Sequence, residues 1–264
     1  MSSSFQRIPF TKASACGNDF LIVEGAGFAG DLAAISQRMC DRHNGVGADG
    51  VEWLFPDAEA DIAARLFNAD GSEAEISGNG TRCVAACLCL QKEKAEFVVR
   101  TGAGPKRCTL KDRQGFTFEF EADMGKPSVG DELTIDTQQL HVAGIRVSMG
   151  NPHYVIFVDR FAEGWQRQAA LIAAQPVFPD GTNIEYVAVR GPSEIEIRLY
   201  ERGVGETQSS GTGACAAVVA AIASRRVTSP VRVVAPGGAQ AVRWENHLYL
   251  QGPAALLCQG AFFV

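Results

Sequence analysis

Two runs of small apolar residues are the clearest helical segments in the chain. The first extends from Thr81 to about Lys92 and the second from Ala214 to about Arg225, and both are rich in alanine and valine. Neither run has a strongly polar face, and a helix that is apolar nearly all round is a buried helix. Because strand-like segments precede each run, we expect each helix to lie inside a curved sheet.

Shorter apolar segments predict strands, and they recur at one separation along the chain. Three pairs of segments stand 133 residues apart (150 − 17 = 184 − 51 = 133): Gly17-Asn18 with Gly150-Asn151, Leu21-Ile22-Val23 with Tyr154-Val155-Ile156, and Val51-Glu52-Trp53 with Ile184-Glu185-Tyr186. A longer match at the same offset pairs Phe67 with Tyr200, Glu73 with Glu206, and Ser77-Gly78-Asn79-Gly80 with Ser210-Gly211-Thr212-Gly213 (210 − 77 = 133). The offset is close to half of the 264 residues, which indicates a duplication.

We therefore predict an α/β fold of two pseudo-symmetric domains, each a curved, mostly antiparallel sheet or barrel wrapped around a central helix. The first domain would comprise residues 1–115, completed by a C-terminal strand at 254–264, and the second residues 116–253. Turn residues at Gln114-Gly115 and at Gly125-Lys126-Pro127 favour a crossover near the middle of the chain.

Composition narrows the classes of function. Hydrophobic residues make up 46% of the chain and charged residues 20%, which is typical of a globular protein. The net charge of −6 gives no electrostatic reason to bind nucleic acid or an anionic membrane. There is no apolar stretch of membrane-spanning length and no apolar signal core near the N-terminus, so we expect a cytoplasmic protein.

The eight cysteines are expected to be reduced thiols, since a chain of this size needs no disulfide bonds to fold. Cys83, Cys87 and Cys89 have helical spacing, apolar neighbours and no histidine nearby. We interpret them as buried apolar side chains rather than as zinc ligands.

Each half carries the motif Ser-Gly-Xaa-Gly at the start of its apolar helix. Backbone N–H groups at a helix N-terminus, together with the helix dipole, can bind a carboxylate, and glycines let it approach closely. A single such motif is more often only a serine N-cap followed by a turn. Two motifs related by pseudo-twofold symmetry would instead face one ligand from opposite sides, which is the geometry of stereoinversion by two proton-transferring groups.

The chain resembles the diaminopimelate epimerases over nearly its whole length. The resemblance rests on ordered blocks, namely Gly17-Asn18-Asp19-Phe20, Asp41-Arg42-His43, Gly45-Val46-Gly47-Ala48-Asp49-Gly50, Asn68-Ala69-Asp70-Gly71-Ser72-Glu73, Gly78-Asn79-Gly80-Thr81-Arg82-Cys83, Met149-Gly150-Asn151-Pro152-His153, Asn183-Ile184-Glu185, Glu201-Arg202-Gly203-Val204-Gly205-Glu206-Thr207 and Gly211-Thr212-Gly213-Ala214.

The resemblance implies interconversion of LL- and meso-diaminopimelate without pyridoxal phosphate, any other cofactor or a metal, in lysine and peptidoglycan biosynthesis, by a homodimer. It implies that substrate is bound by Asn18, Gly50, Asn68, Gly78, Asn79, Asn151, Asn183, Glu201, Arg202, Gly211 and Thr212. Arg202 would pair with the distal carboxylate. His153 and Glu201 would tune the proton affinity of the catalytic pair.

The catalytic pair itself departs from the family, in which both positions are cysteine. Here they are Ser77 and Ser210. A serine hydroxyl without an adjacent base cannot match a thiolate, so we expect binding of substrate but very slow epimerisation. Either deliberate Cys→Ser substitution or a natural relative with different chemistry would give this sequence; the intact surroundings of both serines favour the first.

Three other functions remain open from the sequence. The chain could be another racemase or isomerase of the same superfamily, such as a proline racemase-like or phenazine-biosynthesis-type protein. It could be a non-catalytic amino-acid-binding protein that keeps the carboxylate site. A nucleotide-binding protein is disfavoured, because no glycine-rich loop ends in Gly-Lys-Ser/Thr or opens a helix after a strand with the dinucleotide spacing.

Overall fold

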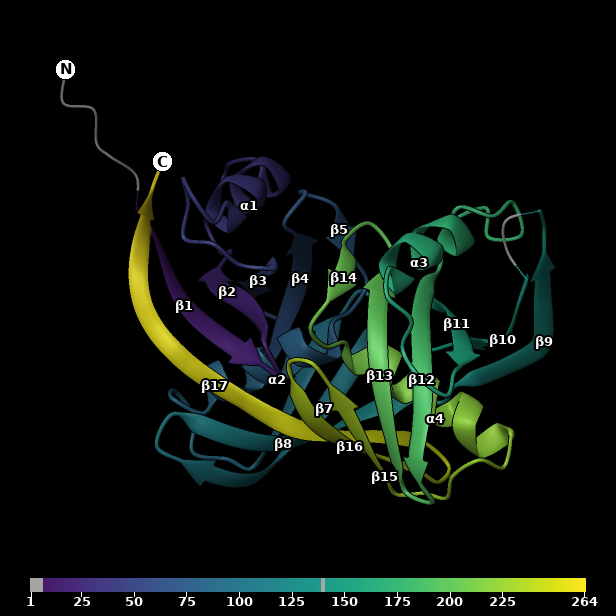
Figure 1. The fold of residues 1–264 in the computed structure, drawn as a ribbon. Coiled ribbons are helices and arrows are strands. Elements are labelled where there is room, and N and C mark those ends of the chain that lie inside the picture. The colour runs from purple at the N-terminus through teal and green to yellow at the C-terminus, as the bar shows by residue number, and fades with distance from the viewer. Residues whose placement is uncertain (1–6, 139–140) are drawn as a thin grey trace. The chain divides into compact units, whose positions relative to one another are not determined.

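A computed structural model describes residues 7–138 and 141–264 of the chain (Figure 1). The chain forms two compact units, which comprise residues 7–122 with 253–264 and residues 123–252 apart from 139 and 140. They are called unit 1 and unit 2 below. The division falls a few residues after the crossover position that the sequence suggests. None of the described helices is long and apolar enough to cross a membrane.

Unit 1 is a sheet folded around the helix α2 (Gly78–Leu88). Its other elements are β1 (Arg7–Ala15), β2 (Asn18–Glu24), α1 (Leu32–Cys40), β3 (Gly50–Phe55), β4 (Ile62–Asn68), β5 (Glu73–Ala74), β6 (Glu96–Thr101), β7 (Gly104–Gln114), β8 (Thr117–Gly125) and the end of β17 (Leu248–Phe263). Helix α2 contacts β1, β2, β6 and β7, and all of its residues are buried.

Unit 2 repeats this plan around the helix α4 (Gly211–Ala223). Its other elements are β9 (Ser128–Asp136), β10 (His141–Ser148), β11 (Pro152–Phe157), α3 (Trp165–Ala173), β12 (Asn183–Gly191), β13 (Glu194–Glu201), β14 (Gly205–Thr207), β15 (Val231–Ala235), β16 (Gly238–Trp244) and the start of β17. Helix α4 contacts strands β9 to β13 and β15 and β16. The predicted fold class, a mostly antiparallel sheet around a buried central helix in each half, is confirmed.

The strand registers of the two units agree residue for residue. In unit 1, β2 pairs in parallel with β3 at Leu21 and Val51, and β3 pairs antiparallel with β4 at Val51 and Phe67. In unit 2, the corresponding partners are Tyr154, Ile184 and Tyr200. Each of these three stands 133 residues after its counterpart (154 − 21 = 184 − 51 = 200 − 67 = 133). The repeat in the sequence is therefore a repeat of the backbone hydrogen-bonding pattern.

Both central helices begin and end earlier than the apolar pattern predicts. They start at Gly78 and Gly211, three residues before the expected Thr81 and Ala214, because a serine cap organises the glycine-containing first turn. Helix α2 ends at Leu88. Beyond it, backbone hydrogen bonds that span three residues instead of four appear, such as the one from Gln91 N–H to Leu88 O (3.0 Å).

The C-terminal strand completes unit 1. Residues of β17 pair antiparallel with β1 from Arg7 opposite Phe263 to Ser14 opposite Ala255. Figure 1 shows this strand in yellow alongside β1 in purple. Unit 1 is thus assembled from two stretches of chain separated by the whole of unit 2.

Candidate active site

The two serines of the repeated motif are the N-caps of the central helices. Ser77 has extended backbone angles (φ −125°, ψ 123°), and its Oγ accepts the N–H of Gly80 at 3.0 Å. Ser210 caps α4 in the same way, with its Oγ 3.2 Å from the nitrogen of Gly213. In both cases the hydroxyl oxygen acts as an acceptor, so the hydroxyl proton can be donated to a further group.

In unit 1 the start of α2 is linked to the start of β2 by a row of polar side chains. Asn18 donates to Asp49 (Nδ2 to Oδ2, 2.7 Å), and its Oδ1 accepts from Asn79 (3.3 Å). The Oδ1 of Asn79 accepts from Arg82 at 2.6 Å. Asn79 and Arg82 are fully buried. The structure thus brings together the predicted substrate-binding residues Asn18 and Asn79 beside the predicted catalytic position 77.

Of the other three predicted binding residues of unit 1, Gly78 is the first residue of α2, and the remaining two are neighbours on adjacent strands. Gly50 at the start of β3 lies opposite Asn68 at the end of β4. A Cβ at Gly50 would stand 2.9 Å from the carbonyl oxygen of Phe67, so only glycine fits there. The Nδ2 of Asn68 donates to Ser72 Oγ at 3.0 Å, which fixes the amide at the turn after β4.

In unit 2 a buried carboxyl–imidazole pair lies beneath the start of α4. His153 Nδ1 is 2.7 Å from Glu185 Oε1, and its Nε2 is 3.0 Å from Asn151 Oδ1. If Nε2 carries a proton for the amide oxygen, a second proton is shared by Nδ1 and the carboxyl group. Burial raises the pKa of Glu185, and the neighbouring imidazole opposes that rise.

Asn183, another predicted binding residue of unit 2, uses both ends of its amide in hydrogen bonds within the protein. Asn183 donates to the carbonyl of Pro152 (2.9 Å) and accepts the backbone N–H of Arg202 (3.0 Å). Its Oδ1 therefore holds the backbone at Arg202, and its Nδ2 holds the start of β11. The Arg202 guanidinium donates to the carbonyl of Asp180 at 3.2 Å, and Glu201 accepts from Thr207 Oγ1 at 2.7 Å.

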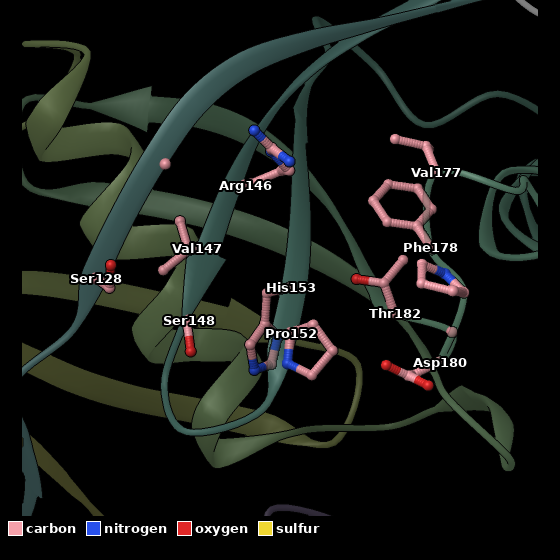
Figure 2. A pocket seen from close by; sticks show the side chains of 13 residues that line it. Ser128, Arg146, Val147, Ser148, Pro152, His153, Val177, Phe178, Asp180 and Thr182 are labelled. Atoms are coloured by element: carbon pink, nitrogen blue, oxygen red, sulfur yellow. The ribbon is translucent and has the colours of Figure 1, made fainter.

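A pocket of about 350 Å³ lies within unit 2 (Figure 2). Pro152 and His153 form one part of its wall, and the segment from Val177 to Thr182 forms another. Arg146 and Asp180 contribute charges of opposite sign. The volume suits a small molecule. Of the residues that line this pocket, His153 alone belongs to the site predicted from the sequence.

Two buried glutamates were not among the predicted site residues. Glu52 on β3 and Glu185 on β12 are 3% and 1% exposed and occupy equivalent positions in the two units (185 − 52 = 133). Burial raises the pKa of Glu52 to about 8. The signal was present in the sequence, because an acidic residue stands at the centre of an apolar strand in both halves.

Comparison with known proteins gives a consistent result. The sequence profile of diaminopimelate epimerase matches residues 10–129 and 145–257. A diaminopimelate epimerase of Desulforudis audaxviator is 39% identical over 95% of this chain and 98% of its own length. Another, of Pelotomaculum thermopropionicum, is 40% identical over 96% of this chain and 98% of its own.

Solved structures agree on the fold. A hydroxyproline epimerase from Agrobacterium vitis, with bound trans-4-hydroxy-L-proline, superposes with a TM-score of 0.80 at 15% identity and covers 100% of this chain and 94% of its own. A predicted epimerase from Pseudomonas aeruginosa gives a TM-score of 0.73 at 15% identity, covering 97% and 98%. At such low identity these likenesses establish the fold alone.

Proposed function

We propose, from the premise that this chain belongs to the diaminopimelate epimerase family, that it binds diaminopimelate on a scaffold for interconverting the LL and meso stereoisomers. The reaction would be a two-base proton transfer without pyridoxal phosphate, in cytoplasmic lysine and peptidoglycan biosynthesis, on a homodimer. Ser77 and Ser210 stand at the positions proposed to exchange a proton with the α-carbon.

The duplicated serine-capped helix start is the observation that carries this proposal. Backbone N–H groups of the first turn of α2 or α4 suit the α-carboxylate, because helix N-termini bind anions. The amides of Asn18, Asn79 and Asn151 supply both donors and acceptors for a zwitterionic amino acid. The Arg202 guanidinium suits the carboxylate at the other end of the substrate.

The serines at positions 77 and 210 set the expected rate. A cysteine at either position would have a thiol whose pKa a helix N-terminus can lower from about 8.5 toward neutrality. A hydroxyl has no comparable ionised population, and each general acid or base typically contributes about 10²- to 10⁴-fold. We therefore propose that the chain binds diaminopimelate but epimerises it very slowly.

Restoring both thiols tests the proposal. Ser77→Cys/Ser210→Cys should gain roughly 10⁴-fold or more in solvent deuterium incorporation at the α-carbon, measured by proton NMR, since two groups are restored. Calorimetry should show that the parent chain and the variant both bind diaminopimelate, and that neither binds hydroxyproline comparably. Ser224→Cys is the matched control, because Ser224 lies at the opposite end of α4 and should give no gain.

The outcomes separate the alternatives. A silent double cysteine variant that still binds diaminopimelate would identify a non-catalytic amino-acid-binding protein. Preferential binding of hydroxyproline would instead favour another racemase of the superfamily. Rapid deuterium incorporation by the parent chain would contradict the slow turnover that we propose for the serine pair.

A further inference from the structure

Glu52 is a buried acid on an otherwise apolar strand. It lies on β3, whose neighbours Val51 and Trp53 point into an apolar cluster with Leu21 and Met39. Because side chains alternate along a strand, Glu52 points to the opposite face, toward α2. Within residues 7–138 and 141–264 its carboxyl group makes no hydrogen bond, although only 3% of the residue is exposed. An unpaired buried acid costs stability, so its presence calls for a reason.

The carboxyl group of Glu52 and the side chain of Ser77 flank the same glycine. A Cβ built on Gly80 would overlap Glu52 Oε1 and would stand 3.2 Å from the Cβ of Ser77. The N–H of that glycine is the donor to Ser77 Oγ. Gly80 therefore gives the carboxyl group access to the first turn of α2, directly beside the serine.

Unit 2 repeats the arrangement with one difference. A Cβ on Gly213 would lie 3.0 Å from Glu185 Oε1 and 3.1 Å from the Cβ of Ser210. There the carboxyl group is bound to His153. The position equivalent to this histidine in unit 1 is Phe20 (153 − 133 = 20), which cannot share a proton. Each serine thus has a buried glutamate beside it, and in unit 1 the glutamate stands alone.

The surroundings of Glu52 keep it protonated near neutral pH. Burial is the cause that raises its pKa to about 8. Glu52 is one of the groups that act electrostatically on the neighbouring Cys83 thiol of α2, and the others are Arg82 on α2, Cys16 before β2, and Asp19 on β2. The Arg82 guanidinium is bound to Asn79 (2.6 Å), and Asp19 to Lys12 (3.0 Å). None of them forms an ion pair with Glu52 within the described part of the chain.

We propose that Glu52 acts through Ser77, as the group that supplies and takes back the proton of the serine hydroxyl. In one direction the Glu52 carboxyl group turns to donate a hydrogen bond to Ser77 Oγ, its O–H bond breaks and that proton passes to Oγ, while the hydroxyl proton passes to the substrate α-carbanion to form the C–H bond. In the reverse direction Ser77 Oγ takes the α-proton while its own proton goes to the Glu52 carboxylate. Charge and atoms balance without any other reactant.

Glu52 is accordingly a positioning residue: it acts through the Ser77 hydroxyl and does not touch the substrate. This inference rests on the proposed function for its substrate, but the proposed coupling of Glu52 to Ser77 would also operate without ligand and can be tested there. It would allow slow exchange at a serine that has no imidazole beside it. A purely structural Glu52 would have no such coupling.

Infrared spectroscopy of the ligand-free protein tests the coupling. The carboxylic acid band of Glu52 is identified as the band that disappears in Glu52→Gln. If the glutamine variant does not fold, the band that shifts in Glu52→Asp identifies it instead. Ser77→Ala should shift the pH at which this band titrates. Ser210→Ala removes the equivalent cap of α4 and should leave that pH unchanged. A titration that Ser77→Ala does not move would overturn the proposal.

Exchange of the substrate α-proton tests the function. In the parent chain, Glu52→Gln should reduce deuterium incorporation into diaminopimelate by roughly 10²-fold. With Ser77→Cys/Ser210→Cys as the background, the same change should cost far less, because the thiol holds its own proton. Glu24→Gln, on the exposed end of β2, is the control for loss of a carboxylate.

Each result decides the question. An equal loss in the serine and cysteine backgrounds would mean that Glu52 is only structural, and the proposal would fail. The absence of any exchange by the serine chain, when the cysteine variant is active, would also overturn it. If diaminopimelate does not bind at all, the proposed function fails, and the infrared titration alone decides the role of Glu52.

Discussion

Glu52 makes the stability of the folded chain depend on pH. Its pKa is about 8 in the folded protein, against 4.5 for an ordinary glutamate, so between these values the folded state binds more protons than the unfolded state. The free energy of unfolding therefore falls as pH rises through this range, and it levels off above pH 8. A change of one in a pKa corresponds to about 1.4 kcal/mol, so the effect is large enough to measure.

Glu52→Gln should remove this dependence. We expect the variant and the parent to differ little in urea unfolding near pH 4.5, and the variant to become progressively more stable than the parent toward pH 8. Glu24→Gln provides the comparison, since it removes an exposed carboxylate from the same unit. A constant difference between Glu52→Gln and the parent across this range would show that Glu52 ionises normally.

The sequence blocks predict individual side chains of the candidate site, but not their hydrogen-bond partners. The structure places Asn18 and Asn79 in contact. It also shows that the amide of Asn183 is engaged within the protein, which no pattern of residue types can reveal. Glu52 and Glu185 escaped attention because β3 and β12 are covered on both faces, so alternation of polar and apolar residues does not mark the inward face.

The central helices depend on the serines that begin them. Ser77→Ala and Ser210→Ala should each lower the free energy of unfolding by about 1 kcal/mol, because each leaves a backbone N–H of the first turn without its acceptor. Chemical denaturation monitored by circular dichroism measures the change.

The matched control for the caps is Ser224→Ala, at the other end of α4. The hydroxyl of Ser224 donates to the carbonyl of Ala220, which also accepts the backbone N–H of Ser224. Its removal leaves that carbonyl satisfied, so the loss of stability should be small. Equal losses for Ser224→Ala and the two cap variants would mean that capping is not what the serines at positions 77 and 210 contribute.

At this scale the sequence predicted the existence and type of the main elements through the repeat. The offset of 133 predicts that the strands β2, β3 and β4 and the helix α2 each have a counterpart in unit 2, and these are β11, β12, β13 and α4. The ends of the helices were misplaced, because glycine in a first turn resembles a loop until the cap is seen. The short strands β5 and β14 each pair with the strand that directly precedes them, β4 and β13, and they are too short for a periodic pattern to mark them.

At the scale of the whole molecule, unit 1 depends on the last strand. Deletion of residues 254–264 removes one of the two strands that pair with β1, and β1 packs on α2. We expect amide hydrogen exchange to accelerate throughout β1 and α2, while β11 and β12 of unit 2 stay protected. Deletion of residues 263 and 264 alone, where Phe263 is 60% exposed, should change little. Undiminished protection of β1 in the longer deletion would contradict this dependence.

The split composition of unit 1 also has a consequence for synthesis on the ribosome. After residue 122, the 130 residues from 123 to 252 must be translated before the strand that completes unit 1 emerges. At about 5 to 20 residues per second, this interval lasts roughly 7 to 26 s. Throughout it, β1 has an open edge able to pair with other chains. Unit 2, which is continuous, can fold first, and a nascent-chain chaperone would be needed chiefly for the half of the protein that is made first.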